Sequence, residues 1–215
     1  MNIGVLGTGA VGQTIGSKLV QLGHTVMMGS RDGANSKAVV WARQEGRNAS
    51  FGSFADAAAF SEIIFNCTYG SASLDALHSA GAENMKGKIL IDTSNPLDYT
   101  DEIWTLTVCN TDSLGEQIQR AFPDTRVVKT LNTMNCDVMV DPNKLLERTS
   151  VFVSGNSADA KATVIKILHD WFGWRSIVDL GDITTSRGVE MYVALWRNLR
   201  RATSSHRFNI KVVHS

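Results

Sequence analysis

Short apolar runs recur along the first 180 residues and alternate with stretches of helical periodicity. Most of these runs are continuously apolar, which is typical of strands that are covered on both faces in a parallel sheet. Strands are expected at residues 2–7, 24–29, 62–68, 88–94, 126–132, 150–155 and 175–181. Helices are expected at residues 10–22, 34–46, 54–60, 71–80, 113–122 and 157–172. This order predicts an α/β fold with a doubly wound, mostly parallel sheet and a small C-terminal α/β region.

Two stretches interrupt this alternation. Residues 95–112 have no clear period and predict a long loop, in which aromatic residues such as Trp104 argue against disorder. Residues 188–203 predict a helix with one apolar stripe. The tail that follows, at residues 206–213, alternates apolar and polar positions as a strand does.

A glycine motif joins the first predicted strand to the first predicted helix. Gly7 allows a tight turn, Gly9 lets the backbone approach a pyrophosphate, and Gly12 lets the helix pack close to the strand. The amides at the helix N-terminus attract the anion. The motif predicts a Rossmann-type dinucleotide site, with cofactor-binding residues Gly7, Thr8, Gly9, Ala10, Val11 and Gly12.

The end of the second predicted strand indicates which dinucleotide binds. An Asp or Glu there would hold ribose hydroxyls, but this strand runs into Ser30 and Arg31. Their hydroxyl and guanidinium suit a 2′-phosphate, and each charge-assisted bond contributes about 1.5–3 kcal/mol. We therefore expect NADP to be preferred over NAD by roughly ten- to a hundredfold, with Thr8 and Lys37 as further donors. The alternatives are that Arg31 is a solvated surface residue, and that Asp32 pairs with it or holds the ribose.

Four segments in order carry a family resemblance: "GTGAVGQTIGSKLVQLGHTVMMGSRD", "IDTSNPL", "DTRVVKTLNTMN" and "VFVSG". The chain resembles the NADPH-dependent F420 reductase (F420-dependent NADP oxidoreductase) family and is similar to the oxidoreductase domain of STEAP metalloreductases. The resemblance implies an NADP-binding Rossmann domain at 1–180, a C-terminal helix and tail at 181–215 for the acceptor site or a dimer contact, and a homodimer. It also implies that Thr68, Asn95 and Pro96 lie near the nicotinamide.

The expected chemistry follows from the proton-transfer groups that the chain lacks. Hydride transfer to a flavin requires orientation and exclusion of water, and needs no protein acid or base. A carbonyl reductase needs a proton donor, and none of Tyr69, Tyr99 and Tyr192 is followed four residues later by Lys. We therefore predict an NADP-dependent oxidoreductase whose acceptor is a flavin or deazaflavin, such as F420, FMN or FAD, with no catalytic side chain assigned. The alternatives are a reductase of small carbonyls or imines, and a non-catalytic NADP(H) sensor.

The acceptor site is expected between the 95–112 loop and the C-terminal helix. The candidate lining residues are Trp104, Tyr192, Trp196 and Arg197. The alternative is that Tyr192 and Trp196, which share a helical stripe, pack in the core or at a dimer contact.

Composition narrows the classes of partner. Twenty-one basic residues balance twenty-one acidic ones, which argues against nucleic acid as a partner and favours a small-molecule substrate. No run reaches the roughly 18 apolar residues that a membrane span needs, and the N-terminus does not read as a signal peptide. The three cysteines and five histidines show no metal-ligand spacing. We therefore expect a cytoplasmic protein without a metal site.

Overall fold

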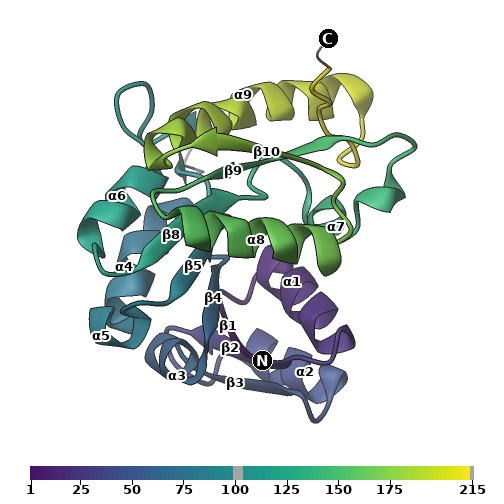
Figure 1. Cartoon of the computed structure of the whole chain (residues 1–215). Coiled ribbons are helices and arrows are strands. Elements are labelled where there is room, and N and C mark those ends of the chain that lie inside the picture. Colours follow the sequence, from purple (N-terminus) through teal and green to yellow (C-terminus); the bar gives the residue numbers. More distant parts are fainter. Residues whose placement is uncertain (99–103, 214–215) are drawn as a thin grey trace.

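A computed structural model describes residues 1–98 and 104–213 of the chain. In this part, one eight-stranded sheet runs through the molecule (Figure 1). The strand order is β10-β9-β8-β5-β4-β1-β2-β3. All neighbouring strands are parallel except β8 and β9, which are antiparallel. The strands are β1 (Asn2–Leu6), β2 (Thr25–Ser30), β3 (Ala49–Ser53), β4 (Ile63–Asn66), β5 (Ile89–Asp92), β8 (Arg126–Thr130), β9 (Ser150–Ser154) and β10 (Ser176–Gly181).

Helices cover both faces of the sheet. One face packs against α1 (Ala10–Gln21), α2 (Ser36–Glu45), α7 (Cys136–Met139) and α8 (Ala158–Asp170). The other face packs against α3 (Phe54–Phe60), α4 (Gly70–Ala80), α5 (Ala82–Met85) and α6 (Leu114–Ala121). The long helix α9 (Ser186–Thr203) lies at the top of the view in Figure 1, beside β9 and β10. The chain also forms two short 3-10 helices, Pro142–Lys144 and Ile183–Thr185, among the described residues.

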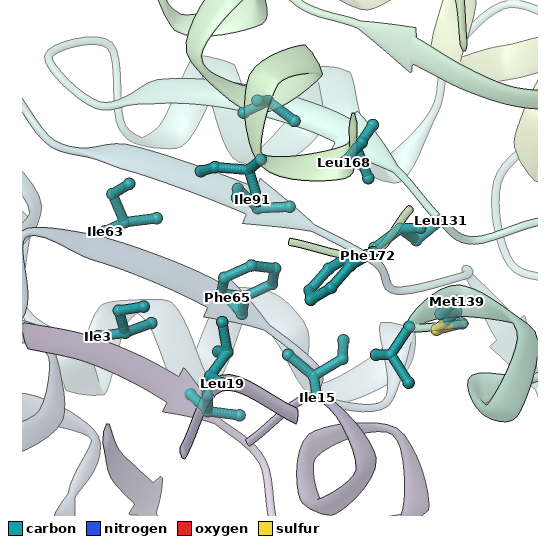
Figure 2. Close-up of a cluster of buried hydrophobic side chains, with 14 of the residues drawn as sticks. Ile3, Ile15, Leu19, Ile63, Phe65, Ile91, Leu131, Met139, Leu168 and Phe172 are labelled. Carbon is teal, nitrogen blue, oxygen red and sulfur yellow. The ribbon is translucent and has the colours of Figure 1, made fainter. Parts of the chain in front are cut away.

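The core explains why the strand sequences are so apolar. Phe65 of β4 meets Phe172, which follows α8, with ring centroids 6.3 Å apart (Figure 2). Ile15 and Leu19, one turn apart on α1, point into the same cluster and are fully buried. Each such side chain contributes roughly 1.5–3 kcal/mol by leaving water. This packing holds the strand ends, and hence the loops that follow them, in fixed positions.

Most of the expected elements are confirmed. The seven predicted strands are β1, β2, β4, β5, β8, β9 and β10, and the predicted helices are α1, α2, α3, α4, α6, α8 and α9. The sequence did not reveal β3, because only Gly52 of that strand is buried and no apolar run marks it.

The two irregular stretches differ from expectation. The predicted loop 95–112 contains a small hairpin, β6 (Leu97–Asp98) and β7 (Thr105–Leu106), while its residues 99–103 lie outside the described residues. The strand expected at 206–213 is wrong, because this tail is irregular. The tail packs against the protein through the half-buried Phe208, Asn209 and Ile210, whereas Val212 is exposed, and Ser150 N donates to Ile210 O at 2.9 Å. None of the helices described combines the length and apolar character needed to cross a bilayer.

Candidate active site

A cavity of about 680 Å³ opens where the strands of the first sheet half end. It lies beyond the carboxyl ends of β1 and β4, between which the strand order reverses, and such switch points are where doubly wound sheets bind ligands. Its wall includes residues from β2, the loops after β5 and β8, and α9. The cavity therefore joins the N-terminal and C-terminal parts of the chain.

The glycine turn forms one end of this cavity. Gly7 has φ +116°, and a Cβ there would lie 2.6 Å from Cys67 O, so the turn requires glycine. A Cβ on Gly12 would lie 2.1 Å from Gly7 O, so only glycine lets α1 start this close to β1. These two glycines are structural, and they fix the backbone that faces the cavity.

Gly9 is different from its two neighbours in the motif. It lines the cavity, and a Cβ added to it would meet no protein atom within 4 Å. It is also the N-cap of α1, where no side chain caps the helix. The first amides of a helix have no partner within the helix, so an anion such as a diphosphate fits against this backbone.

The end of β2 supplies a polar corner to the same cavity. Ser30, Arg31 and Asp32 all line it; Ser30 is buried, whereas Arg31 and Asp32 are exposed. The Ser30 hydroxyl donates to Asp32 Oδ1 at 3.2 Å. Arg31 forms no ion pair with a described residue. The Arg31–Asp32 pair that the sequence left open is therefore not formed, and the guanidinium faces the cavity's solvent.

A buried polar network supports the central strand ends. The Asn66 amide donates to Asp92 Oδ1 at 2.8 Å, and the Ser94 hydroxyl donates to the same oxygen at 2.6 Å. The Thr68 hydroxyl donates to Asn66 Oδ1 at 2.7 Å. Thr68 and Ser94 line the cavity, so the network fixes the floor of the site.

Lys129 is the cation of this network. It is fully buried in β8, and its ammonium donates to Asp92 Oδ2 at 2.8 Å, to Ser94 O at 2.6 Å and to Glu190 Oε1 at 2.8 Å. Burial alone lowers the pKa of Lys129, but the two carboxylates outweigh it and raise the pKa. Glu190 belongs to α9 and also accepts from Leu114 N at 2.8 Å. One buried triad therefore connects the central sheet, α6 and α9.

Two asparagines join the loops that follow β5 and β8. Asn95 Nδ2 donates to Asn132 O at 2.8 Å, and Asn132 Nδ2 donates to Asn95 Oδ1 at 2.9 Å. Asn132 also donates to Val189 O, at 3.0 Å. Leu131 has φ +63°, an uncommon conformation for leucine that turns the chain toward Asn95. Both amides are thus used to hold the cavity wall together.

The C-terminal side of the cavity is more apolar. It is formed by Met134, Val193 and Trp196, with Arg200 at the edge. Trp104 lines the cavity too, and the Arg197 guanidinium lies 5.1 Å from the centroid of its ring. A flat apolar surface with a cation beside it suits an aromatic ligand.

Cys67, the cysteine nearest the glycine turn, is not a reactive thiolate. Burial raises the pKa of the Cys67 thiol to about 12, so it stays protonated at neutral pH. Cys136 also lines the cavity. In the part of the chain that the structure describes, no histidine, lysine or glutamate lines the cavity, and Asp32 is its acidic residue.

The structure brings most of the predicted site residues together. Gly7, Thr8, Gly9, Ala10, Val11, Ser30, Arg31, Thr68, Asn95, Trp104 and Trp196 line the cavity, whereas Gly12, Pro96, Tyr192 and Arg197 do not. Gly12 and Arg197 nevertheless contact lining residues: a Cβ on Gly12 would clash with Gly7 O, and Arg197 lies over the Trp104 ring. The Tyr192 hydroxyl is buried without a hydrogen-bond partner among the described residues, and burial raises its pKa.

Sequence reasoning missed Cys136 and Val193 as lining residues, and it gave Lys129 no role. A lysine inside an otherwise apolar strand was the available signal for the buried network, because such a charge needs partners. No local pattern marked Cys136 and Val193, since the fold alone brings them to the cavity.

Comparison with known proteins agrees with this geometry. The family described as NADP oxidoreductase, coenzyme F420-dependent, matches residues 2–96. A solved structure from Arthrobacter sp. FB24, assigned provisionally as an F420-dependent NADP-reductase, is 47% identical, with a TM-score of 0.94 and coverage of 99% of both chains.

More distant relatives share parts of this picture. Metalloreductase STEAP3 from Rattus norvegicus is 27% identical over 190 residues, which is 87% of this chain and 35% of that protein, so this chain spans about a third of its length. A reductive aminase from Aspergillus terreus, solved with NADPH and ethyl levulinate, is 18% identical, with a TM-score of 0.66 and coverage of 94% of this chain and 62% of that one. At this identity the likeness concerns the fold.

Proposed function

The chain belongs to the coenzyme F420-dependent NADP oxidoreductase family, and on this premise we propose that it transfers a hydride between NADPH and a flavin or deazaflavin acceptor. That it is an NADP-dependent oxidoreductase follows from the family itself. The identity of the acceptor is the new part of the proposal. The observation that carries it is a cavity with a backbone anion cradle at one end and an aromatic, apolar wall at the other.

The proposed cofactor end uses the residues around the glycine turn. The Gly7–Gly12 backbone would hold the pyrophosphate, while Thr8, Ser30 and Arg31 would hold the 2′-phosphate. Two observations support this: Gly9 leaves open space where a side chain would be, and Arg31 has no described carboxylate partner. NADPH, when bound, supplies the hydride. Thr68 and Asn95 would border its nicotinamide end, with Pro96 next to Asn95 but outside the lining, and the Asn66–Asp92 network makes this wall rigid.

The proposed acceptor end is the wall that contains Trp104 and Trp196. A flavin ring accepts a hydride without a protein acid, and the described lining holds no histidine, lysine or glutamate that would protonate an alkoxide. The protein's contribution is therefore to orient two flat rings and exclude water. Arg197 supports this wall by lying over the Trp104 ring, and Tyr192 lies on α9 outside the lining.

A reductase of small carbonyls or imines is the second candidate. It is favoured by the hydroxyl of Tyr69 and the thiol of Cys136, which line the cavity as proton-bearing groups. It also agrees with the shared fold of the reductive aminase. A sensor that binds NADP(H) without turnover is the third.

An anaerobic acceptor panel tests the three candidates. The protein is mixed with NADPH and, separately, F420, FMN, FAD, a cyclic imine and a keto ester, and absorbance at the nicotinamide band is followed. Transfer to F420, FMN or FAD is the expected result. Turnover of the imine or keto ester without a flavin would instead establish the second candidate, and tight NADPH binding with no turnover would establish the sensor.

We also propose that the protein forms a homodimer through its C-terminal helix. Leu195 on α9 is 53% exposed, which is high for a leucine in a long helix. Light scattering coupled to size-exclusion chromatography gives the mass directly, and a monomer at micromolar concentration would contradict the proposal.

A further inference from the structure

The chain beyond α9 turns back and packs beside the acceptor wall. Ser204 ends α9 in the left-handed conformation, with φ +51°, and this reverses the chain direction. The Phe208 ring then stacks on the Trp196 ring, with centroids 5.5 Å apart and planes inclined by 27°. Figure 1 shows this tail returning from the end of α9 toward the sheet.

Hydrogen bonds fasten the tail on the far side of Phe208. Asn209 Nδ2 donates to Ser150 O at 2.9 Å and to Thr149 Oγ1 at 3.0 Å. Ser150 N donates to Ile210 O at 2.9 Å, and Val212 N donates to the Ser150 hydroxyl at 3.1 Å. These bonds attach the tail to the start of β9, so Phe208 is held in place from the sheet.

An ion pair fastens the near side. The Arg207 guanidinium lies 3.3 Å from Asp137 Oδ2, and Asp137 follows Cys136, which lines the cavity. The ring of Trp196 lacks such an anchor, because its Nε1 is buried without a hydrogen-bond partner in the described part of the chain. Ring contacts therefore set the orientation of Trp196: Phe208 stacks on it, and Arg200 lies 5.9 Å from its centroid.

We infer that Phe208 is a positioning residue for the hydride acceptor, and that the tail Ser205–Val213 is a structural part of the acceptor site. Phe208 does not line the cavity, but it fixes the ring of Trp196, which does. The inference rests on the proposed function, because it assigns the Trp196 wall to the acceptor. It predicts that damage to the stack weakens the acceptor and leaves NADPH unaffected.

The experiment compares Phe208→Leu with the unchanged protein, with FMN as the acceptor under anaerobic conditions. Leucine keeps an apolar side chain but removes the stacked ring, so the KM for FMN is expected to rise about tenfold, the equivalent of one aromatic contact. The KM for NADPH is expected to stay within about twofold. Phe208→Tyr keeps the ring and should restore the KM for FMN.

Two controls separate positioning from a general structural effect. Phe51→Leu removes an exposed phenylalanine of β3, away from the cavity, and should change neither KM. Lys166→Ala removes an exposed ion pair with Asp170 on α8, away from the tail and the cavity lining, and should likewise change neither. Thermal unfolding of every variant verifies that it is folded.

The outcomes distinguish this inference from the proposed function. If the unchanged protein reduces FMN and Phe208→Leu has the same KM for FMN, the role of Phe208 is wrong while the proposed function holds. An equal rise in the KM for NADPH would show a merely structural role. If the unchanged protein neither binds nor reduces FMN or F420, both proposals are wrong.

Discussion

The two ends of the cavity are built in opposite ways. The proposed cofactor end comes from one continuous stretch, residues 7–32, and is lined by backbone and by the polar side chains of Thr8, Ser30, Arg31 and Asp32. The proposed acceptor end comes from the hairpin around Trp104, the loop after β8, and α9, which lie far apart in the sequence. It is lined mainly by side chains, and Phe208 of the tail stacks on one of them, Trp196.

This difference has consequences for specificity. A backbone cradle depends on chain geometry, so few substitutions adjust it gradually, and it suits a ligand that never changes. A side-chain wall changes with each substitution, so it suits a substrate that differs among relatives. The buried triad of Lys129, Asp92 and Glu190 joins the two ends, because its members lie in β8, β5 and α9.

Disrupting the buried triad of Lys129, Asp92 and Glu190 should have the largest effect on stability. Lys129→Met leaves the Asp92 and Glu190 carboxylates buried without their cation, which should lower the free energy of unfolding by about 3–5 kcal/mol. Urea denaturation measures it. Glu190→Gln is the matched control: Lys129 keeps Asp92, and the amide oxygen can still accept from Lys129 and Gly115 N while Leu114 N loses its acceptor, so its cost should be smaller. Equal costs would show that the charge of Lys129 is not what joins the halves.

The next test concerns the backbone cradle alone. Gly9→Ala adds a methyl group that meets no protein atom, at an ordinary φ of −78°, so folding stability should not change. The methyl group would occupy the space proposed for the pyrophosphate, and the affinity for NADPH should fall by at least about tenfold. Calorimetric titration and thermal unfolding measure the two quantities.

Gly188→Ala is the control for this variant. Its added methyl group also meets no protein atom, but Gly188 lies in α9 outside the cavity lining. It should leave NADPH affinity unchanged and stabilise the helix by about 0.5–1 kcal/mol. Unchanged NADPH affinity in Gly9→Ala would place the pyrophosphate elsewhere.

The side-chain part of the cofactor end should respond more gradually. Arg31→Glu replaces the proposed partner of the 2′-phosphate with a like charge, so the preference for NADPH over NADH should fall by roughly ten- to a hundredfold. Dissociation constants for both cofactors give this ratio. Lys37→Glu changes an exposed residue outside the lining and should shift the ratio far less. An unchanged ratio in Arg31→Glu would contradict the assignment.

The smallest expected effect lies near the acceptor end, just before α6. The hydrogen bond from Arg120 lowers the pKa of Asp112 to about 2. Because the folded pKa is below the unfolded value of about 3.9, the stabilisation is complete above pH 4 and is lost as pH falls toward 2. Asp112→Asn should therefore cost about 1 kcal/mol at pH 7, a figure reduced for the exposure of Arg120.

Urea denaturation at pH 7 and near pH 2.5 measures this pH dependence. The difference between Asp112→Asn and the unchanged protein should shrink at the lower pH. Asp124→Asn, whose partner Lys86 lies 3.8 Å away in an exposed pair, serves as the control and should behave as the unchanged protein. A difference that persists at low pH would mean that the Asp112 carboxylate charge is not the cause.

The sequence by itself determined the sheet strands that carry apolar runs, and it predicted the residues of the proposed cofactor end. Strands and glycine turn alike are marked by residues close together in the sequence. A strand that is buried on two faces is continuously apolar, and the turn requires Gly7 and Gly12 at a fixed spacing. Ser30 and Arg31 were readable for the same reason, because they end the strand that follows.

Only the tertiary structure decided the acceptor end. The partners of Lys129, the Asn95–Asn132 pair and the Phe208–Trp196 stack each join residues that lie far apart or on either side of a chain reversal. Such contacts depend on how α9 packs against the sheet and on the left-handed turn at Ser204. The local pattern of apolar and polar residues predicts neither. The tail alternates apolar and polar residues as a strand would, yet it is irregular: it packs through the half-buried Phe208, Asn209 and Ile210 and leaves Val212 exposed, and only the fold places Phe208 against Trp196.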